Sequence, residues 1–111
     1  MSIRQFIEEN NIAVFVRADL KTCEFEITEG SARLSSRDLL EQLILNGSVE
    51  GLKNSIKDQL MPRIWMQGRT KCFVCQPDEN CLVALFLDSD LDPKELYLYA
   101  KHLDSLLAQV M

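Results

Sequence analysis

A continuous apolar run at residues 82–87 is the clearest feature of the hydrophobic pattern. It predicts a strand that is buried on both faces of a sheet. Asp92, Pro93 and Glu95 then match a helix start, with a capping carboxylate, a proline at the first helical position and a glutamate three residues after the cap. Apolar residues recur at helical spacing to the end of the chain, which predicts a terminal helix packed over the sheet. These residues are Leu96, Ala100, Leu103, Leu107 and Val110.

The N-terminal part of the chain predicts a short helix followed by two strands. Ser2 and Gln5 match a capping box for a helix over residues 3–9. Residues 13–18 are rich in β-branched and aromatic side chains, and residues 23–28 alternate between apolar and polar, which is typical of strands. The polar segment between them can turn, so we expect these two strands to form a hairpin.

The middle of the chain predicts helix with an interruption. Ser35 and Asp38 offer a second capping pair, and apolar residues follow at helical spacing as far as Pro62. Asn46 and Gly47 interrupt this stripe, and such residues commonly close a helix. We therefore expect a kink or a break at Gly47. The apolar positions are Leu39, Leu40, Leu43, Ile44, Val49, Leu52, Ile56 and Leu60.

Three further strands complete the predicted sheet. Residues 64–67 form a short strand candidate that contains the only tryptophan, residues 70–75 form a second, and residues 82–87 form the third. A turn at residues 77–80 joins the last two. The predicted order is α-β-β-α-β-β-β-α. We expect one α+β domain over residues 1–111, with a single five-stranded, largely antiparallel sheet covered by helices.

Composition narrows the classes of function. The chain has 111 residues, of which 47% are hydrophobic and 26% charged, as is typical of a globular domain. The formal net charge is −5, and the 12 Lys and Arg residues are scattered. Nucleic acids and anionic membranes bind clustered basic residues, so we expect neither as a partner. The sequence has no stretch long enough for a membrane span and no signal-peptide pattern, so we expect a cytoplasmic protein.

The cysteines raise the question of a zinc site. Cys72 and Cys75 have C-x-x-C spacing, Cys81 follows closely, and His102 could supply a fourth ligand. A zinc knuckle needs a turn between its paired cysteines, whereas the Phe-Val pair found here favours an extended strand with the two thiols on opposite faces. We therefore interpret the cysteines as buried thiols and expect neither a metal nor another cofactor.

The usual catalytic patterns are missing from the sequence. His102 is the only histidine and lies in the middle of a predicted helix. The chain contains no Gly-x-Ser-x-Gly elbow, no Walker loop and no dinucleotide fingerprint. Glu24 and Glu26 alternate along a predicted strand, which places them on a solvated face. We therefore expect no enzymatic activity.

Trp65 is the main candidate for contact with a partner. It lies beside Met66 in a short predicted strand, between a helix and Gly68. If that strand is at the edge of the sheet, its backbone could pair with another chain, and Trp65 and Met66 would serve as apolar anchors. The alternative is that Trp65 packs beneath the helix of its own chain. The sequence leaves both interpretations open.

Taken in order, these elements resemble the roadblock family, which includes dynein light chains and bacterial motility and GTPase-regulating proteins. The likeness spans nearly the whole chain and is clearest over residues 73–88, where a strand, a polar turn and an apolar strand lead towards the terminal helix. The resemblance implies a profilin/roadblock-like fold and a non-enzymatic regulatory or scaffolding module. Asn46 and Gly47 interrupt what is normally one continuous helix in that family.

The resemblance also implies an interface. Roadblock-like proteins typically dimerise by pairing a middle strand, with the long helices on one side, and the joined platform binds a small GTPase or a scaffold. In this chain the pairing strand would comprise Ile64, Trp65, Met66 and Gln67. The helix face would comprise Leu45, Val49, Leu52 and Ile56. We therefore expect a homodimer whose further partner is a small GTPase or another protein.

The alternative resemblance is to type III secretion chaperones, which hold an unfolded effector segment on apolar patches. They are small, acidic, cytoplasmic α/β dimers that also end with an apolar strand and a helix. They usually have three strands before their second helix, whereas two are predicted here before Ser35. The strand count before Ser35 therefore distinguishes the two resemblances.

Overall fold

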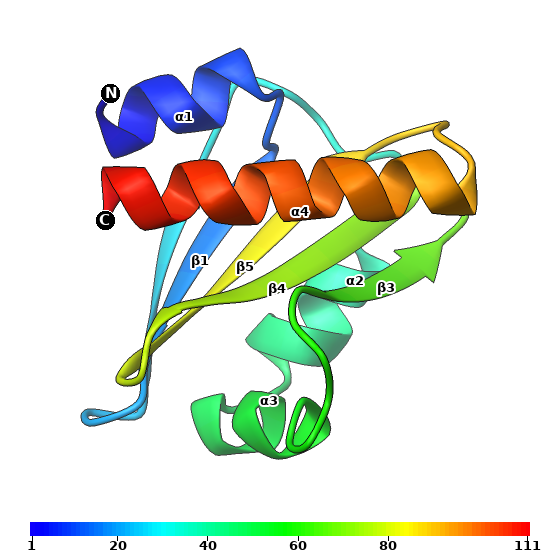
Figure 1. The fold of residues 1–111 in the computed structure, drawn as a ribbon. Coiled ribbons are helices and arrows are strands. Elements are labelled where there is room, and N and C mark those ends of the chain that lie inside the picture. Colours follow the sequence, from blue (N-terminus) through cyan, green and yellow to red (C-terminus); the bar gives the residue numbers. More distant parts are fainter.

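A computed structural model describes all residues, 1–111, and its elements follow the predicted order (Figure 1). Two strands precede Ser35, as the roadblock-like order requires, and not the three of the secretion chaperones. The prediction of an α+β chain with a five-stranded sheet is confirmed. The elements are α1 (Ile3–Glu9), β1 (Val14–Asp19), β2 (Glu24–Glu29), α2 (Asp38–Leu40), the π-helical turn η1 (Glu41–Leu45), α3 (Val49–Ser55), β3 (Arg63–Gln67), β4 (Thr70–Asp78), β5 (Cys81–Asp88) and α4 (Pro93–Val110).

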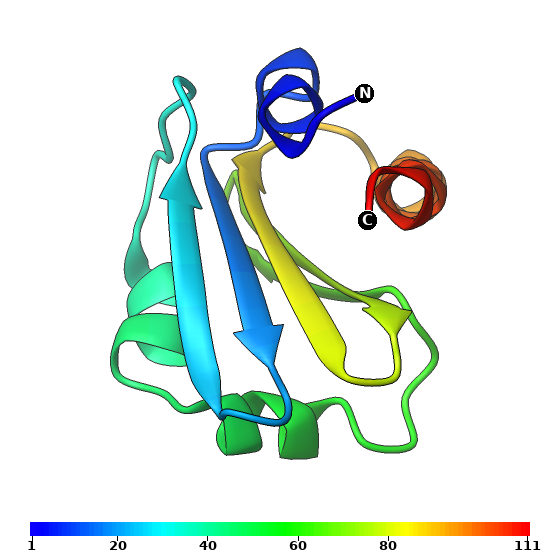
Figure 2. The ribbon, with the colours of Figure 1, turned by 90° about the vertical axis from the view of Figure 1, so that its left-hand side faces the viewer.

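The strands form one antiparallel sheet in the order β2-β1-β5-β4-β3. β5 is central, and β2 and β3 are the two edges. The helices α1 and α4 cover one face, whereas α2 and α3 lie on the other side and at the lower end of the sheet (Figures 1 and 2). None of the helices is both long enough and apolar enough to span a bilayer.

The core consists of two clusters, one on each face of the sheet. β5 contributes to both because successive side chains of a strand point to opposite faces. Its side chains at positions 82–87 are at most 2% exposed, so the prediction of a doubly buried strand is confirmed. Leu82, Ala84 and Phe86 join the α2 and α3 side, and Val83, Leu85 and Leu87 join the α1 and α4 side.

The helical stripe predicted as far as Pro62 ends earlier, because α3 stops at Ser55 and Leu60 is 90% exposed. Two boundaries beside hairpins also differ from the predictions. β4 extends to Asp78, with an irregular register between Cys75 and Asp78, so the turn into β5 is shorter than expected. Cys23 lies in the turn before β2 with a φ of 60° and is exposed. Both differences occur beside tight hairpins, where local backbone geometry decides which residues join the ladder.

The helix breaks at Gly47, as expected. η1 ends at its cap Asn46, and Ser48 begins α3 by accepting a hydrogen bond from the Gly51 N–H at 3.0 Å. A Cβ atom at Gly47 would collide with the Leu43 carbonyl oxygen, which explains the glycine at the break.

The capping prediction for Ser35 and Asp38 is wrong. The residue before α2 is Arg37, and its side chain makes no capping hydrogen bond. The Ser35 N–H instead donates to Asp88 Oδ2 at 2.9 Å, and the Ser35 and Thr70 hydroxyl oxygens lie 3.2 Å apart. Ser35 therefore attaches the loop after β2 to the ends of β4 and β5, a long-range role that local spacing does not reveal.

Asp92→Ala is expected to lower the free energy of unfolding by about 1 kcal/mol, because an N-cap side chain satisfies a backbone N–H that has no partner within the helix. Asp92 Oδ1 accepts from the Glu95 N–H at 2.8 Å at the start of α4. Urea titration followed by circular dichroism measures the loss. Asp92→Ser is the control, because serine also caps helices well. Equal losses in the two variants would contradict the capping role.

Candidate functional site

β3 provides an open edge of the sheet, as the edge-strand interpretation required. It pairs with β4 on one side, from Arg63 opposite Val74 to Gln67 opposite Thr70, and with no strand on the other. The turn between the two strands contains Gly68, whose φ of 61° suits a tight hairpin. An open edge leaves backbone N–H and C=O groups available to another chain.

Trp65 combines the two interpretations left open by the sequence. Its ring packs against the core cluster on the α2 side, yet the residue remains half-buried. The Arg63 guanidinium lies over the ring, 5.2 Å from its centroid, which is cation–π geometry. The indole is therefore held in place by its own chain and still presents surface at the edge.

The other β3 side chains also remain partly accessible. Ile64 is half-buried against the α4-side cluster, and Met66 is 58% exposed. Gln67 is exposed, and its Nε2 donates to Asp38 Oδ2 at 3.4 Å, which connects the end of β3 to the start of α2. The predicted pairing strand thus presents an apolar centre with polar ends.

The predicted helix face requires a correction. Val49, Leu52 and Ile56 are 2%, 3% and 8% exposed and pack in the core cluster on the α2 and α3 face. Their side chains hold α3 against the sheet and are not available to a partner. Leu45 is 52% exposed and is the one member of the predicted set that faces solvent. Apolar periodicity identified the inward stripe of this helix and could not identify its outward face.

The cysteines and the histidine do not converge. Cys72 lies in the core cluster on one face of the sheet, and Cys75 and Cys81 lie in the cluster on the other, as the extended-strand interpretation predicted. Burial raises the pKa of all three thiols, which disfavours the thiolate that binds metals. His102 is exposed on α4. No group of three or more His, Cys, Asp and Glu side chains is arranged to hold a metal ion.

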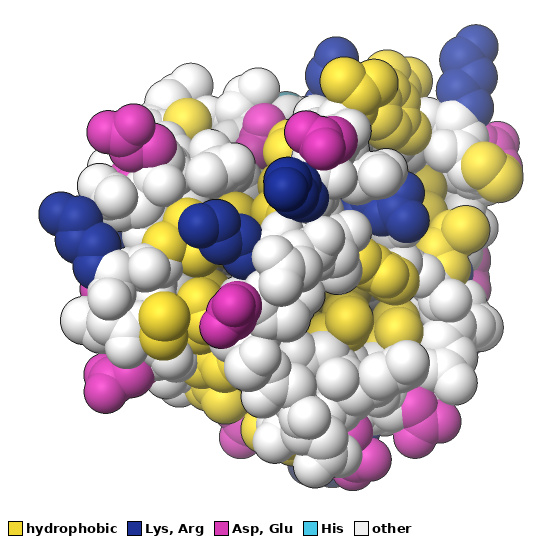
Figure 3. Space-filling model, turned by 90° about the horizontal axis from the view of Figure 1, so that it is seen from below, with side chains coloured by type: hydrophobic (Ala, Val, Ile, Leu, Met, Phe, Trp, Pro, Cys, Tyr) yellow, Lys and Arg dark blue, Asp and Glu magenta, His cyan; other side chains and the backbone are white.

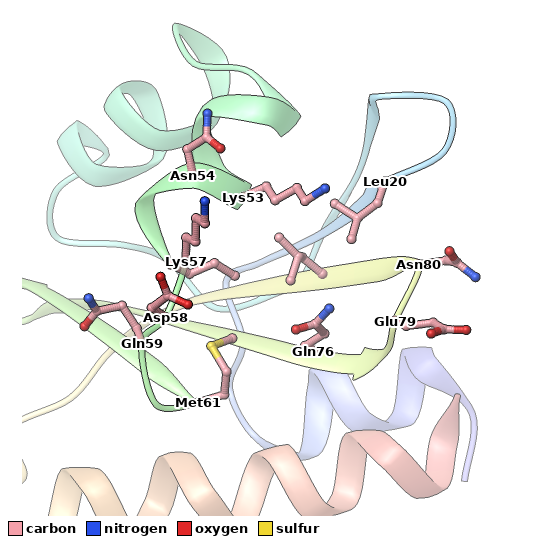
Figure 4. A pocket seen from close by; sticks show the side chains of 12 residues that line it. Leu20, Lys53, Asn54, Lys57, Asp58, Gln59, Met61, Gln76, Glu79 and Asn80 are labelled. Atoms are coloured by element: carbon pink, nitrogen blue, oxygen red, sulfur yellow. The ribbon is translucent and has the colours of Figure 1, made fainter.

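A pocket of about 610 Å³ lies where α3 meets the lower end of the sheet (Figure 4). Lys53 and Lys57 come from the helical side, and Gln76, Glu79 and Asn80 come from the β4–β5 hairpin. Four lining residues are hydrophobic, among them Met61 and Leu82, and Asn54, Asp58 and Gln59 complete the polar part of the lining. The lining contains no hydroxyl, thiol or imidazole group, and its charged groups are two lysines, Lys53 and Lys57, and two carboxylates, Asp58 and Glu79. The sequence did not reveal it, because distant segments form it.

The face that carries α3 shows apolar patches between basic and acidic side chains, without a field of one sign (Figure 3). The three ion pairs in the chain are Arg4 with Glu8, Arg37 with Glu29, and Arg69 with Asp90. All are exposed, and such pairs contribute little to stability.

The sequence matches no protein-family model. It also matches no curated protein sequence. Its fold is similar to two solved structures of MglB. One, described as MglB with tetrameric arrangement, has a TM-score of 0.55 and 16% identity, with 97% of this chain and 83% of that chain covered. The other, Myxococcus xanthus MglB, has a TM-score of 0.52 and 12% identity, with 96% and 88% covered. The chain therefore has the roadblock-like α+β fold of MglB.

Proposed function

We propose that this chain is a non-enzymatic regulatory module that forms a homodimer through β3 and presents the joined surface to a protein partner of the small-GTPase class. The open β3 edge carries the proposal. It combines unpaired backbone with a held indole at Trp65 and an exposed thioether at Met66. Aromatic and methionine side chains are enriched in interfaces between proteins. The GTPase-binding role rests on the resemblance to the roadblock family together with the MglB-like fold.

The opposite edge of the sheet is less suited to pairing with a copy of itself. β2 carries Glu24, Glu26 and Glu29, so two copies of β2 would bring like charges together. Charged side chains at a sheet edge typically prevent such association. β3 carries no acidic side chain. The charge distribution therefore favours β3 as the edge that pairs.

Trp65→Glu is expected to weaken dimerisation at least about tenfold, because it places a charge at the apolar centre of the interface in both copies. Sedimentation equilibrium at micromolar concentration measures the dissociation constant. Ile27→Glu on β2 is the matched control, since Ile27 is 43% exposed on the other edge strand. The control should dimerise like the unchanged chain. A monomeric unchanged chain at these concentrations would contradict the dimer.

The partner class is tested separately. The dimeric chain and its Trp65→Glu variant are used as baits in the native host, and captured proteins are identified by mass spectrometry. We expect a small GTPase that is enriched on the dimer and reduced on the variant. If the dimer captures no GTPase, the partner class is wrong even though the dimer stands.

A further inference from the structure

The backbone of β3 restricts how two copies can pair. The Arg69 carbonyl oxygen accepts from the Ser89 N–H at 2.9 Å, which directs the odd-numbered positions at the start of β4 towards β5. Hydrogen-bonded and non-bonded positions alternate in an antiparallel ladder, so Thr70, Cys72 and Val74 point their backbone groups towards β3. Their partners on β3 are the odd-numbered residues. The outward backbone groups of β3 therefore belong to Ile64 and Met66.

One register satisfies all of these groups. In a dimer whose two-fold axis is perpendicular to the sheet, the two β3 strands run antiparallel and the α2 sides of both copies lie on the same face of the joined sheet. Directly opposed residues point their side chains to the same face, so their residue numbers are both odd or both even. An axis at Trp65 opposes Ile64 with the partner's Met66, and all outward groups of both residues find partners. An axis at Ile64 would oppose Met66 with Pro62, which has no N–H to donate. An axis at Met66 would oppose Ile64 with Gly68 in the turn.

The side chains fit the same register. On the α2 side of the sheet, Trp65 of one copy faces Trp65 of the other. On the opposite side, Ile64 of each copy meets Met66 of the other. Arg63 lies opposite Gln67 of the second copy, and Gln67 is hydrogen bonded to Asp38 at 3.4 Å. The axis at Trp65 therefore brings Arg63 of each copy towards Asp38 of the other.

Arg63 and Asp38 each lack an ion-pair partner within the chain. The Arg63 Nε–H is buried without an acceptor, and its Nη1 reaches only Gln59 Oε1 at 3.4 Å. A carboxylate from the second copy would supply the acceptor that a guanidinium binds best. We propose that a reciprocal Arg63–Asp38 ion pair across the two-fold axis fixes the β3–β3 register with Trp65 at its centre. This inference rests on the proposed homodimer.

Charge reversal tests the pairing. Arg63→Glu alone places two carboxylates opposite each other, and Asp38→Arg alone places two guanidinium groups together, so each variant should dimerise about tenfold more weakly than the unchanged chain. Mixing the two variants makes both pairs attractive in the heterodimer. One pair is the original Arg63 with Asp38, and the other joins the two introduced charges with their positions exchanged. We therefore expect heterodimers to exceed a statistical mixture, and this preference should shrink as salt is raised. Native mass spectrometry counts the species, since the variants differ in mass.

Lys21→Glu is the control, because it makes the same charge change as Arg63→Glu at the β1–β2 turn and should leave dimerisation unchanged. Far-ultraviolet circular dichroism of each variant checks that it is folded. If the single variants dimerise as tightly as the unchanged chain, or if the mixture is statistical, the ion pair is wrong, while the dimer stands as long as Trp65→Glu still dissociates it. A monomeric unchanged chain would overturn both.

Discussion

Phe73→Ala is expected to lower the free energy of unfolding by about 3 to 5 kcal/mol, the usual cost of removing a fully buried aromatic ring. Phe73 is 0% exposed on β4, opposite Ile64 of β3 and Leu85 of β5. Its ring meets Tyr99 of α4 edge-to-face, with centroids 6.2 Å apart. The substitution therefore leaves a cavity between α4 and the sheet, and domains of this size have only about 5 to 15 kcal/mol in total.

Urea titration at 25 °C measures this loss, provided that fluorescence and circular dichroism report one transition. Phe25→Ala is the matched control, because Phe25 is a half-buried phenylalanine on the edge strand β2. Its loss should be less than half as large, since less apolar surface is removed from the core. A loss for Phe73→Ala below about 1.5 kcal/mol would mean that α4 closes over the cavity and that the packing is softer than the structure indicates.

Thr70→Val is expected to cost about 2 kcal/mol, although valine and threonine have nearly the same shape. The Thr70 hydroxyl is fully buried, donates to Asp88 Oδ1 at 2.9 Å, and accepts from the Ser36 N–H at 3.2 Å. Valine removes both bonds and leaves partly buried groups without partners. The same hydroxyl also contacts Ser35, so one atom joins the loop before α2 to the ends of β4 and β5.

Thr70→Ser separates the hydroxyl from the methyl group. Serine keeps the hydrogen bonds and loses one buried methyl group, so it should cost about 0.8 kcal/mol. The readout is again the unfolding free energy, supplemented by hydrogen exchange at the Ser36 amide, which should become faster in the valine variant only. Equal losses for the two substitutions would show that packing, rather than hydrogen bonding, makes Thr70 important.

Thr70→Val and Phe73→Ala also differ in their expected effect on the proposed interface. Thr70 begins β4, the strand that supports β3, and Asp38 lies just beyond the loop that Thr70 holds. Loosening this loop should allow Asp38 to move relative to Gln67. If the Arg63–Asp38 pair forms between copies, Thr70→Val should therefore weaken dimerisation as well as stability, whereas Phe73→Ala acts mainly through stability.

The candidate site was only partly predictable. The sequence identified the short strand with Trp65 and Met66, because β-branched and aromatic residues bounded by turn signals are typical of strands. It could not identify that strand as an edge, since neighbours in a sheet are set by the whole topology. The resemblance to the roadblock family implied that Val49, Leu52 and Ile56 face a partner, whereas their side chains pack in the core of this chain. An apolar stripe predicts that one side of a helix is buried, but it does not distinguish burial in the core of the same chain from burial against a partner.

The sequence alone determined the features that depend on residues close together in the chain. These are the order of elements, the doubly buried strand β5, the break at Gly47 and the cap at Asp92. Only the tertiary structure decided the role of Ser35, the pocket between α3 and the sheet, and the open side of β3. Each of these depends on contacts between distant segments, such as Ser35 with Asp88. Local periodicity predicts elements because it shows which side of a segment is buried, whereas polar contacts between distant segments depend on how the hydrophobic core places those segments.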